Sequence, residues 1–280
     1  MLSRLDLLNL ALASRNAYTN DMATKPLLKA LTEAGIGSRR WLADAIKQGR
    51  VKVNRAIAED FRQPVDVETD HISISGQPID LKPRQLVYLV LNKPKGIMST
   101  TSDERGRRTV IDILPEKYHK LRLYPVGRLD KDSTGLLLLT NDGEFTNQLT
   151  HPRFENEKEY LVSINGKLKP DEKRKLEQGV ELEDGLTHPA AVKEIEAPPF
   201  NYSITIHEGR KRQVRRMFES IGHTVLTLKR VRLGSLNLGK LKEGEIRELS
   251  VKEVKALFNL HLSRQQTTTP NAKADIPSNE

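Results

Sequence analysis

The feature that most constrains the fold is a run of four leucines, Leu136–Leu139, which an Asn-Asp-Gly triplet follows closely. A short apolar run bounded by turn-forming residues predicts a strand that is buried on both faces and ended by a tight turn. Just before it, Asp130 and Asp132 lie in a segment flanked by glycines, where the backbone can bend sharply. Charges placed against a buried strand either form a structural ion pair or take part in chemistry. The residues alone leave both interpretations open.

Length and charge narrow the class of protein. A chain of 280 residues is long enough to bury a full core and to form more than one domain. Its formal net charge of +9 favours an acidic partner, and RNA is the commonest one for a basic protein. The absence of cysteine excludes disulfides, thiolate metal sites and cysteine nucleophiles, and it fits a reducing compartment. Because no apolar run reaches the length of a transmembrane helix, we expect a cytoplasmic protein without membrane contact.

The first part of the chain predicts a small unit with two helices and a strand. Apolar residues recur at helical spacing over residues 27–34, and Gly35 ends that helix. Ser38 can cap a second helix that ends at Gly49, and residues 50–53 alternate as a strand. The basic side chains of this unit form either a solvated surface or an RNA-binding one, and they are Arg39, Arg40, Lys47, Arg50 and Lys52.

Composition divides the rest of the chain. Residues 77–85 contain two prolines among polar residues and predict a linker. Beyond it, strands and helices mix without regular alternation up to about residue 260, which favours a mixed, mainly antiparallel sheet with helices packed on it. Polar residues dominate the segment 263–280, so we expect a disordered tail. We interpret residues 1–24 as a dispensable N-terminal extension, within which Met22 is an alternative start.

Two further segments carry side chains suited to chemistry. Five of the seven residues from Arg210 to Arg216 are basic, and a helix there would bury Val214 and Met217. Its arginines share a neighbouring face, which suits either solvent or phosphate groups. In the alternating strand that begins at residue 158, Tyr160 is either ordinary core or part of a site.

Four motifs occur in an order that resembles the RsuA/RluB-type pseudouridine synthases across nearly the whole length of that family. They are Asn92–Gly96, Pro125–Asp130, Lys158–Tyr160 and Gly209–Met217. The resemblance implies a mixed α/β (α+β) fold with a mainly antiparallel sheet over residues 85–260. It also implies an isomerase that converts a uridine of ribosomal RNA into pseudouridine, with no metal and no organic cofactor.

A second resemblance concerns the small unit, residues 25–82. The strings Ala34–Arg40 and Gly49–Asn54 resemble the RNA-binding module named after ribosomal protein S-four. This implies a small α/β domain that grips RNA by its backbone and shape. Arg55 departs from the module's pattern, because that family usually has glycine there, and this leaves the form of the turn open.

The family resemblance also assigns roles to residues. It makes Asp130 the catalytic nucleophile and implies that Tyr160 stacks on the target uracil. It makes Arg215 the partner of the catalytic aspartate, with Arg212 as the fallback, and we expect Asp132 to support the turn. The reaction breaks the bond from C1′ to N1, turns the base and rejoins it through C5, which requires an ionised carboxylate. The residues expected to bind RNA are Arg39, Arg40, Arg50, Lys52, Arg128, Arg210, Arg212 and Arg216.

The resemblance also bears on the RNA target and on the alternative functions. Overall similarity favours the enzymes that modify the large-subunit (23S) RNA, so we expect ribosomal RNA as the partner of a monomeric enzyme. The alternatives are a small-subunit (16S) enzyme and a non-catalytic ribosome-assembly protein, although the latter would be expected to lack the aspartate, the arginine or the tyrosine. An RNA hydrolase using Asp130 and Asp132 would need a metal site, and no further carboxylate cluster supports one.

Overall fold

The computed structural model describes residues 24–82 and 84–266, and these divide into two compact units. The first unit runs up to Val87 and includes Lys117–Leu123 and Thr140–Gly143. The second contains the rest of the described chain from Tyr88 onward. The predicted N-terminal extension lies outside the described residues apart from Thr24, which begins a strand. No helix of the described residues is long and apolar enough to cross a membrane.

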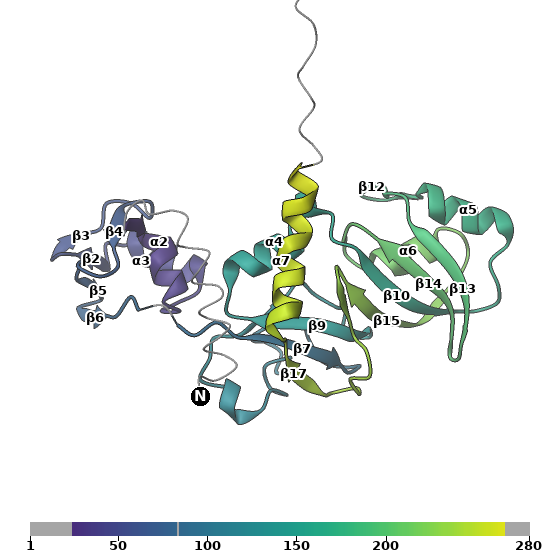
Figure 1. The fold of residues 1–280 in the computed structure, drawn as a ribbon, viewed down its shortest axis with the longest axis horizontal. Coiled ribbons are helices and arrows are strands. Elements are labelled where there is room, and N and C mark those ends of the chain that lie inside the picture. The colour runs from purple at the N-terminus through teal and green to yellow at the C-terminus, as the bar shows by residue number, and fades with distance from the viewer. Residues whose placement is uncertain (1–23, 83, 267–280) are drawn as a thin grey trace, which may run out of the picture. The chain divides into compact units, whose positions relative to one another are not determined.

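The first unit is a small α/β module (Figure 1). Strands β3, β2, β5 and β6 form an antiparallel sheet in that order, and β1 pairs with β4. The two predicted helices are confirmed, and Ser38 caps the second by accepting a hydrogen bond from the amide of Trp41. The bounds are β1 Thr24–Pro26, α2 Leu27–Glu33, α3 Arg39–Lys47, β2 Val51–Val53, β3 Ala56–Ile57, β4 Pro64–Asp66, β5 Ile72–Ile74 and β6 Gln77–Ile79.

The prediction that the linker begins at Gln77 is wrong. Gln77–Ile79 is strand β6, which pairs with β5 at the edge of the sheet. Pro78 has no amide hydrogen to donate, and an edge strand tolerates a proline because one side of its backbone has no neighbouring strand. Leu81 is also buried in the core of the module. The packed part of the module therefore extends at least to Leu81, inside the segment that was predicted as a linker.

The turn between β2 and β3 shows how Arg55 replaces the usual glycine. Its two central residues, Asn54 and Arg55, have φ angles of 49° and 72°. Positive φ at both positions is the arrangement of a tight hairpin turn that favours Asn-Gly. Asn54 is held by hydrogen bonds to the Asp70 carboxylate at 2.7 Å and from the His71 amide at 2.9 Å. The turn thus keeps the form that glycine would favour, with arginine in a left-handed conformation.

We expect Arg55→Gly to stabilise the module. The left-handed conformation costs an L-residue roughly 1–2 kcal/mol, and after subtracting the extra freedom of glycine in the unfolded chain the gain is about 0.5–1 kcal/mol. Urea unfolding followed by fluorescence measures it, because the single tryptophan, Trp41, lies in this module. Arg55→Ala is the control, since it removes the same charge without relieving the backbone. An unchanged or lower unfolding midpoint for Arg55→Gly would contradict the expectation.

The second unit is built on a nine-stranded sheet (Figure 1). The main strand order is β13-β14-β10-β15-β9-β7-β17. Strand β10 is antiparallel to β14 and β15, whereas β9 is parallel to β15, so the predicted mixed, mainly antiparallel sheet is confirmed. The strands are β7 Tyr88–Lys93, β8 Tyr124–Val126, β9 Thr134–Thr140, β10 Lys158–Ile164, β11 Glu181–Leu182, β12 Gly185–Leu186, β13 Ala191–Ala197, β14 Phe200–Ile206, β15 Val225–Leu233, β16 Leu236–Asn237 and β17 Ile246–Glu248.

Helices cover this sheet and close its core. The aromatic ring of Phe145 lies 4.9 Å from that of Tyr88 and 5.1 Å from that of Phe258, which packs two helices onto β7. The leucine run forms the buried strand that its sequence predicts, but helix α4 follows it instead of a tight turn. The helices are α4 Gly143–Thr150, α5 Pro170–Gln178, α6 Gln213–Glu219 and α7 Val251–Gln266, with 3-10 turns at η2 Glu116–Tyr118 and η3 Pro152–Phe154.

The predicted start of the disordered tail is also wrong. Helix α7 continues from Val251 through Gln266, so residues 263–266 are helical. Arginine and glutamine are good helix formers, and adding a residue to an existing helix is much easier than starting one. The apolar pattern therefore ends at Leu262, whereas the helix continues to Gln266. The remainder of the predicted tail lies outside the described residues.

Candidate active site

A pocket of about 500 Å³ opens within the second unit. One wall is the loop between β8 and β9, which contains Asp130. Strands β10 and β15 contribute Tyr160 and Arg230, and the segment before helix α6 contributes Arg212. Three of the four motifs identified in the sequence therefore meet around one cavity.

The fourth motif, Asn92–Gly96, holds the loop of Asp130 in place through the side chain of Lys93. Lys93, the last residue of β7, is 0% exposed. Its Nζ donates hydrogen bonds to the carbonyl oxygens of Ser133 at 2.9 Å and Pro94 at 3.0 Å. The hydroxyl of Ser99 donates to the carbonyl of Leu129 at 2.8 Å. These contacts bracket Asp130 on both sides, so the loop that presents its carboxylate is fastened to the sheet.

Burial lowers the pKa of Lys93 to about 8, although the nearby negative charges of Asp132 and Asp130 oppose the shift. The sequence singled out the segment Asn92–Gly96 but gave Lys93 no role. A signal was present, because a lysine that closely follows a run of apolar strand residues must find partners for its ammonium group when buried. The geometry supplies those partners from the carbonyl groups of the neighbouring loop.

The arginines of the site are arranged differently from the prediction. Arg215 lies with its Nη2 3.2 Å from Oδ2 of Asp132, and its predicted pairing with Asp130 stays a prediction. Arg212 forms an ion pair with Asp130, and its Nη1 lies 3.9 Å from Oδ2 of that residue. The same Nη1 lies 3.3 Å from Oδ1 of Asp132. The fallback residue, Arg212, is therefore the one that reaches the predicted nucleophile.

Backbone conformation explains why Arg212 contacts Asp130 and Arg215 contacts Asp132. Arg212 immediately precedes α6 with a left-handed φ of 52°, and its side chain remains 41% exposed beside the loop. Arg215 lies inside the helix, is only 5% exposed and donates to the carbonyl of Val225 at 2.9 Å. Helical spacing alone would place both on one surface, but Arg212 is not in the helix. The two side chains consequently reach different aspartates.

Tyr160 lies on β10, is 8% exposed and lines the pocket. Lys158 lies two residues earlier, and alternate residues of a strand share a face. The sequence left open whether Tyr160 is a core residue or a site residue. Its position is compatible with both, because the side chain is mostly buried and still lines the cavity. Its role in stacking remains a prediction.

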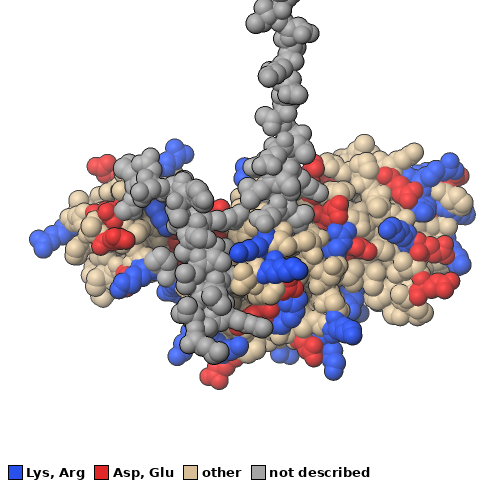
Figure 2. All heavy atoms as spheres, in the orientation of Figure 1, with Lys and Arg blue, Asp and Glu red and all other residues tan. Residues whose placement is uncertain are grey.

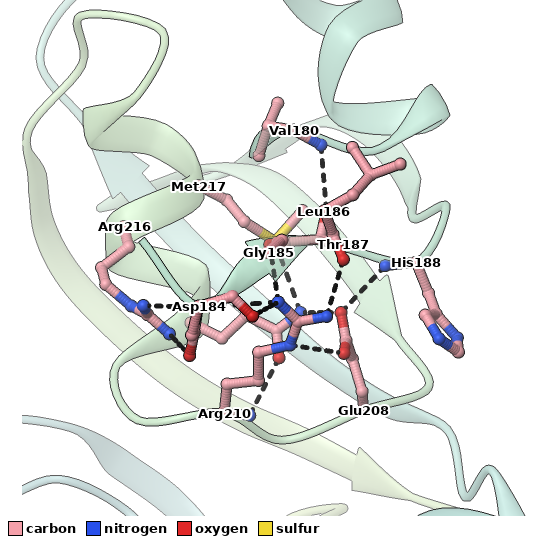
Figure 3. A network of polar contacts seen from close by, with 11 residues as sticks. Val180, Asp184, Gly185, Leu186, Thr187, His188, Glu208, Arg210, Arg216 and Met217 are labelled. Carbon is pink, nitrogen blue, oxygen red and sulfur yellow. Dashed lines mark hydrogen bonds and ion pairs between the residues drawn. The ribbon is translucent and has the colours of Figure 1, made fainter. Parts of the chain in front are cut away.

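Arg210 and Arg216, both predicted to bind RNA, are held by contacts within the chain (Figure 3). Arg210 donates to Glu208 at 2.9 Å and to the carbonyl groups of Gly185 and Leu186 at 2.7 and 2.6 Å. Arg216 forms two hydrogen bonds with Asp184, at 2.8 and 3.0 Å. Both guanidinium groups therefore fasten the β11–β12 hairpin beside the pocket. An additional contact with RNA stays a prediction for each.

The other predicted RNA-binding residues occupy two places. Arg128 lines the pocket next to Asp130. In the first unit, Arg39, Arg40 and Lys52 are exposed, and the guanidinium of Arg50 lies 5.5 Å from the ring centre of Trp41. On the face drawn in Figure 2, basic and acidic side chains are interspersed. In the described part of the chain, no group of three or more His, Cys, Asp or Glu residues could hold a metal ion.

Comparison with known proteins shows similarity along most of the chain. Residues 87–220 match the family model for RNA pseudouridylate synthase. The chain is 44% identical over 235 residues to ribosomal large subunit pseudouridine synthase B of Bacillus subtilis, which covers 82% of this chain and 94% of that protein. It is 42% identical over 215 residues to the protein of the same name from Vibrio vulnificus, covering 75% of this chain and 67% of that one. A crystal structure of a pseudouridylate synthase aligns with a TM-score of 0.60 at 32% identity and covers 82% of this chain and 98% of that chain.

The lowered pKa of Lys93 predicts a specific dependence of stability on pH. The folded pKa of about 8 lies below the ordinary 10.5, so the cost of burying the charge is fully present below pH 8 and is relieved as the pH rises toward 10.5. Relative to Lys93→Met, the wild type should therefore gain roughly 1–2 kcal/mol in unfolding free energy between pH 7 and about pH 9.5. Urea unfolding followed by circular dichroism at both pH values measures the difference. A constant gap between the two proteins would contradict it.

Proposed function

The chain belongs to the family of RNA pseudouridine synthases, and from this premise we propose that it converts a uridine of large-subunit (23S) ribosomal RNA into pseudouridine. The observation that carries the proposal is its likeness to two large-subunit enzymes, which extends along most of the chain. The pocket supports it, because it combines a carboxylate, an aromatic ring and several cations. We also propose that the enzyme acts as a monomer, and its proposed substrate suggests a cytoplasmic one.

Asp130 is the residue proposed to act on the ribose. Its carboxylate lines the pocket and is 32% exposed, so a nucleotide entering the pocket can reach it. An ionised carboxylate can attack C1′ or remove a proton from the sugar, and either route lets the bond from C1′ to N1 break. The guanidinium of Arg212 attracts the carboxylate and sets its direction. We propose Arg212, in place of Arg215, as the arginine that orients Asp130.

Tyr160 is proposed to hold the detached base. The base must rotate before C5 can bond to C1′, and a base lost to water would end the reaction without product. The side chain of Tyr160 is mostly buried and lines the pocket, so its aromatic ring can stack on the uracil while the uracil turns. The target must also leave its stack in the RNA to enter such a pocket.

The first unit is proposed to bind RNA without taking part in the chemistry. Its basic side chains Arg39, Arg40, Arg50 and Lys52 can contact phosphates, which gives affinity without sequence readout. Arg128 lies in the pocket wall beside Asp130, where it can contact the RNA next to the target nucleotide. These assignments are independent of the identity of the target uridine.

Mapping pseudouridines in ribosomal RNA tests the proposed function. RNA from cells with and without the gene is probed chemically at every uridine of both subunits. The proposal requires one or more large-subunit positions to lose the modification and to regain it when the wild-type gene is restored. Loss at a small-subunit position would instead identify a small-subunit enzyme, and unchanged maps of both RNAs would favour an assembly protein without activity.

We expect Asp130→Asn to abolish pseudouridine formation and to leave RNA affinity nearly unchanged. The amide has almost the same shape but is not a nucleophile or a base. The activity assay uses large-subunit RNA transcripts, and a filter assay measures affinity. Asp132→Asn is the matched comparison and should be milder, because Asp132 contacts two arginines beside the reacting group. Substantial activity of Asp130→Asn would remove Asp130 from the reaction.

Arg212→Lys should lower turnover by about tenfold, roughly 1.4 kcal/mol of barrier, because a lysine lacks the planar donors that orient a carboxylate. Arg247→Lys is the control, since Arg247 pairs with Glu253 and is not part of the pocket wall. Single-turnover rates on the same transcript decide the matter. A large loss in Arg215→Lys together with a small one in Arg212→Lys would restore the assignment made from the sequence.

A further inference from the structure

Two cations of the pocket wall have no part in the chemistry described so far. Lys158 lies on the same face of β10 as Tyr160, two residues before it. Arg230 lies on the neighbouring strand β15, directly opposite Tyr160 in the register. All three line the pocket. The proposed stacking residue is therefore accompanied by one cation along its own strand and another across the sheet.

A β-bulge in β15 turns Arg230 toward the pocket. Glu159 pairs with Arg232 and Tyr160 pairs with Arg230, so Val231 is an extra residue between the two pairs. In a regular strand, Arg230 and Arg232 would share a face, but an extra residue reverses the alternation. Arg232 contacts the carboxylates of Glu157 and Glu159 at 2.8 and 2.9 Å. Arg230 is left on the pocket side, with no carboxylate among its contacts in the described residues.

Arg230 has a buried donor without a partner. The side chain is only 3% exposed, and its Nε donates to the carbonyl of Leu136 at 2.8 Å. Its Nη2 is buried and makes no hydrogen bond to any described residue. A buried donor without a partner is costly, so native proteins rarely keep one without a purpose. Gly135 allows β9 to approach Arg230 closely, since a Cβ there would lie 2.2 Å from the carbonyl oxygen of Arg230.

Lys158 is a second cation that is held without a carboxylate partner in the described residues. Its Nζ donates to the carbonyl of Asn156 at 2.9 Å, and its Cε packs beside Gly209, 3.7 Å from where a Cβ would lie. Burial lowers the pKa of Lys158 to about 8, and the positive charge of Arg230 adds to the shift while Glu208 opposes it. The ammonium and the guanidinium are therefore close enough to repel each other across the pocket wall.

We propose that Arg230 and Lys158 bind the carbonyl oxygens of the target uracil and stabilise the base while it is detached. This rests on the proposed function. When the bond from C1′ to N1 breaks, its electron pair stays on the base and spreads over N1, O2 and O4. In the covalent route, C1′ becomes bonded to a carboxylate oxygen of Asp130. Fixed cations at O2 or O4 stabilise the charge that develops there.

The same two side chains favour uracil over cytosine. Lys and Arg carry only hydrogen-bond donors, and O4 of uracil is an acceptor. Cytosine has an amino group in place of O4, so it would set a donor against a donor and leave the buried cation without a partner. A tyrosine that stacks on the flat ring cannot make this distinction, because every base has a similar face. The cations thus add selection to a pocket whose aromatic wall provides only stacking.

Tritium release measures the effect on the reaction. A large-subunit RNA transcript labelled with [5-3H]uridine loses tritium to water when C5 bonds to C1′. With enzyme in excess, we expect Lys158→Met and Arg230→Gln each to lower the rate by about tenfold or more, with RNA affinity within about twofold of wild type. Lys229→Met is the control, since Lys229 lies between pocket residues on β15 and is absent from the pocket wall. Rates of both variants within about twofold of wild type would overturn the inference.

Thio-substituted transcripts separate contact with the base from a structural effect. Sulfur accepts hydrogen bonds weakly, so 4-thiouridine or 2-thiouridine should slow the wild type. A variant that has already lost the contact should be slowed less by the same substitution, whereas equal slowing of wild type and both variants with both transcripts would overturn the inference. If Arg230→Gln melts at a lower temperature by circular dichroism, Lys158→Met decides. A wild-type protein that releases no tritium from uridine would defeat the proposed function itself.

Discussion

The buried ammonium group of Lys93 is the contact on which the candidate site depends. Asp130 lies on a loop, and loops are ordinarily the more mobile parts of a fold. Lys93 ties that loop to β7 by donating to the carbonyl of Ser133 at 2.9 Å and to that of Lys131 at 3.5 Å, while Ser99 ties the other side of the aspartate. The cost of burying the lysine appears in its lowered pKa. The benefit is a carboxylate held in one place, which is what a reaction at a single carbon of the ribose requires.

The sheet supplies the rest of the site through its irregularities. Strands β10 and β15 are neighbours, so Tyr160 and Arg230 face each other. The bulge at Val231 then separates two arginines that alternation would have placed together: Arg232 neutralises Glu157 and Glu159, whereas Arg230 faces the pocket. Bulges are frequent next to active sites for this reason, because one additional residue redirects a side chain without ending the strand.

Much of the fold could be predicted because its signals are local. The leucine run specified a buried strand, and Ser38 specified the start of a helix, since each depends on neighbours within a few positions. The predictions that were wrong used local signals where distant partners decide. Prolines suggested a linker at Gln77, but pairing with β5 made it an edge strand. The polar segment from Ser263 suggested disorder, but helix α7 extends into it.

For the site, the sequence by itself determined which residue types are present and in what order: a carboxylate between glycines, a tyrosine in a strand and a basic segment before a helix. Together with the motif Asn92–Gly96, and in this order, those features resemble a single family. Only the tertiary structure decided which charges meet. The left-handed backbone at Arg212 directs it toward Asp130, and burial in α6 directs Arg215 to Asp132. Ion pairs act over a few ångströms between residues some 80 positions apart, as the contact of Arg212 with Asp132 illustrates, and spacing along a chain carries no information about such distances.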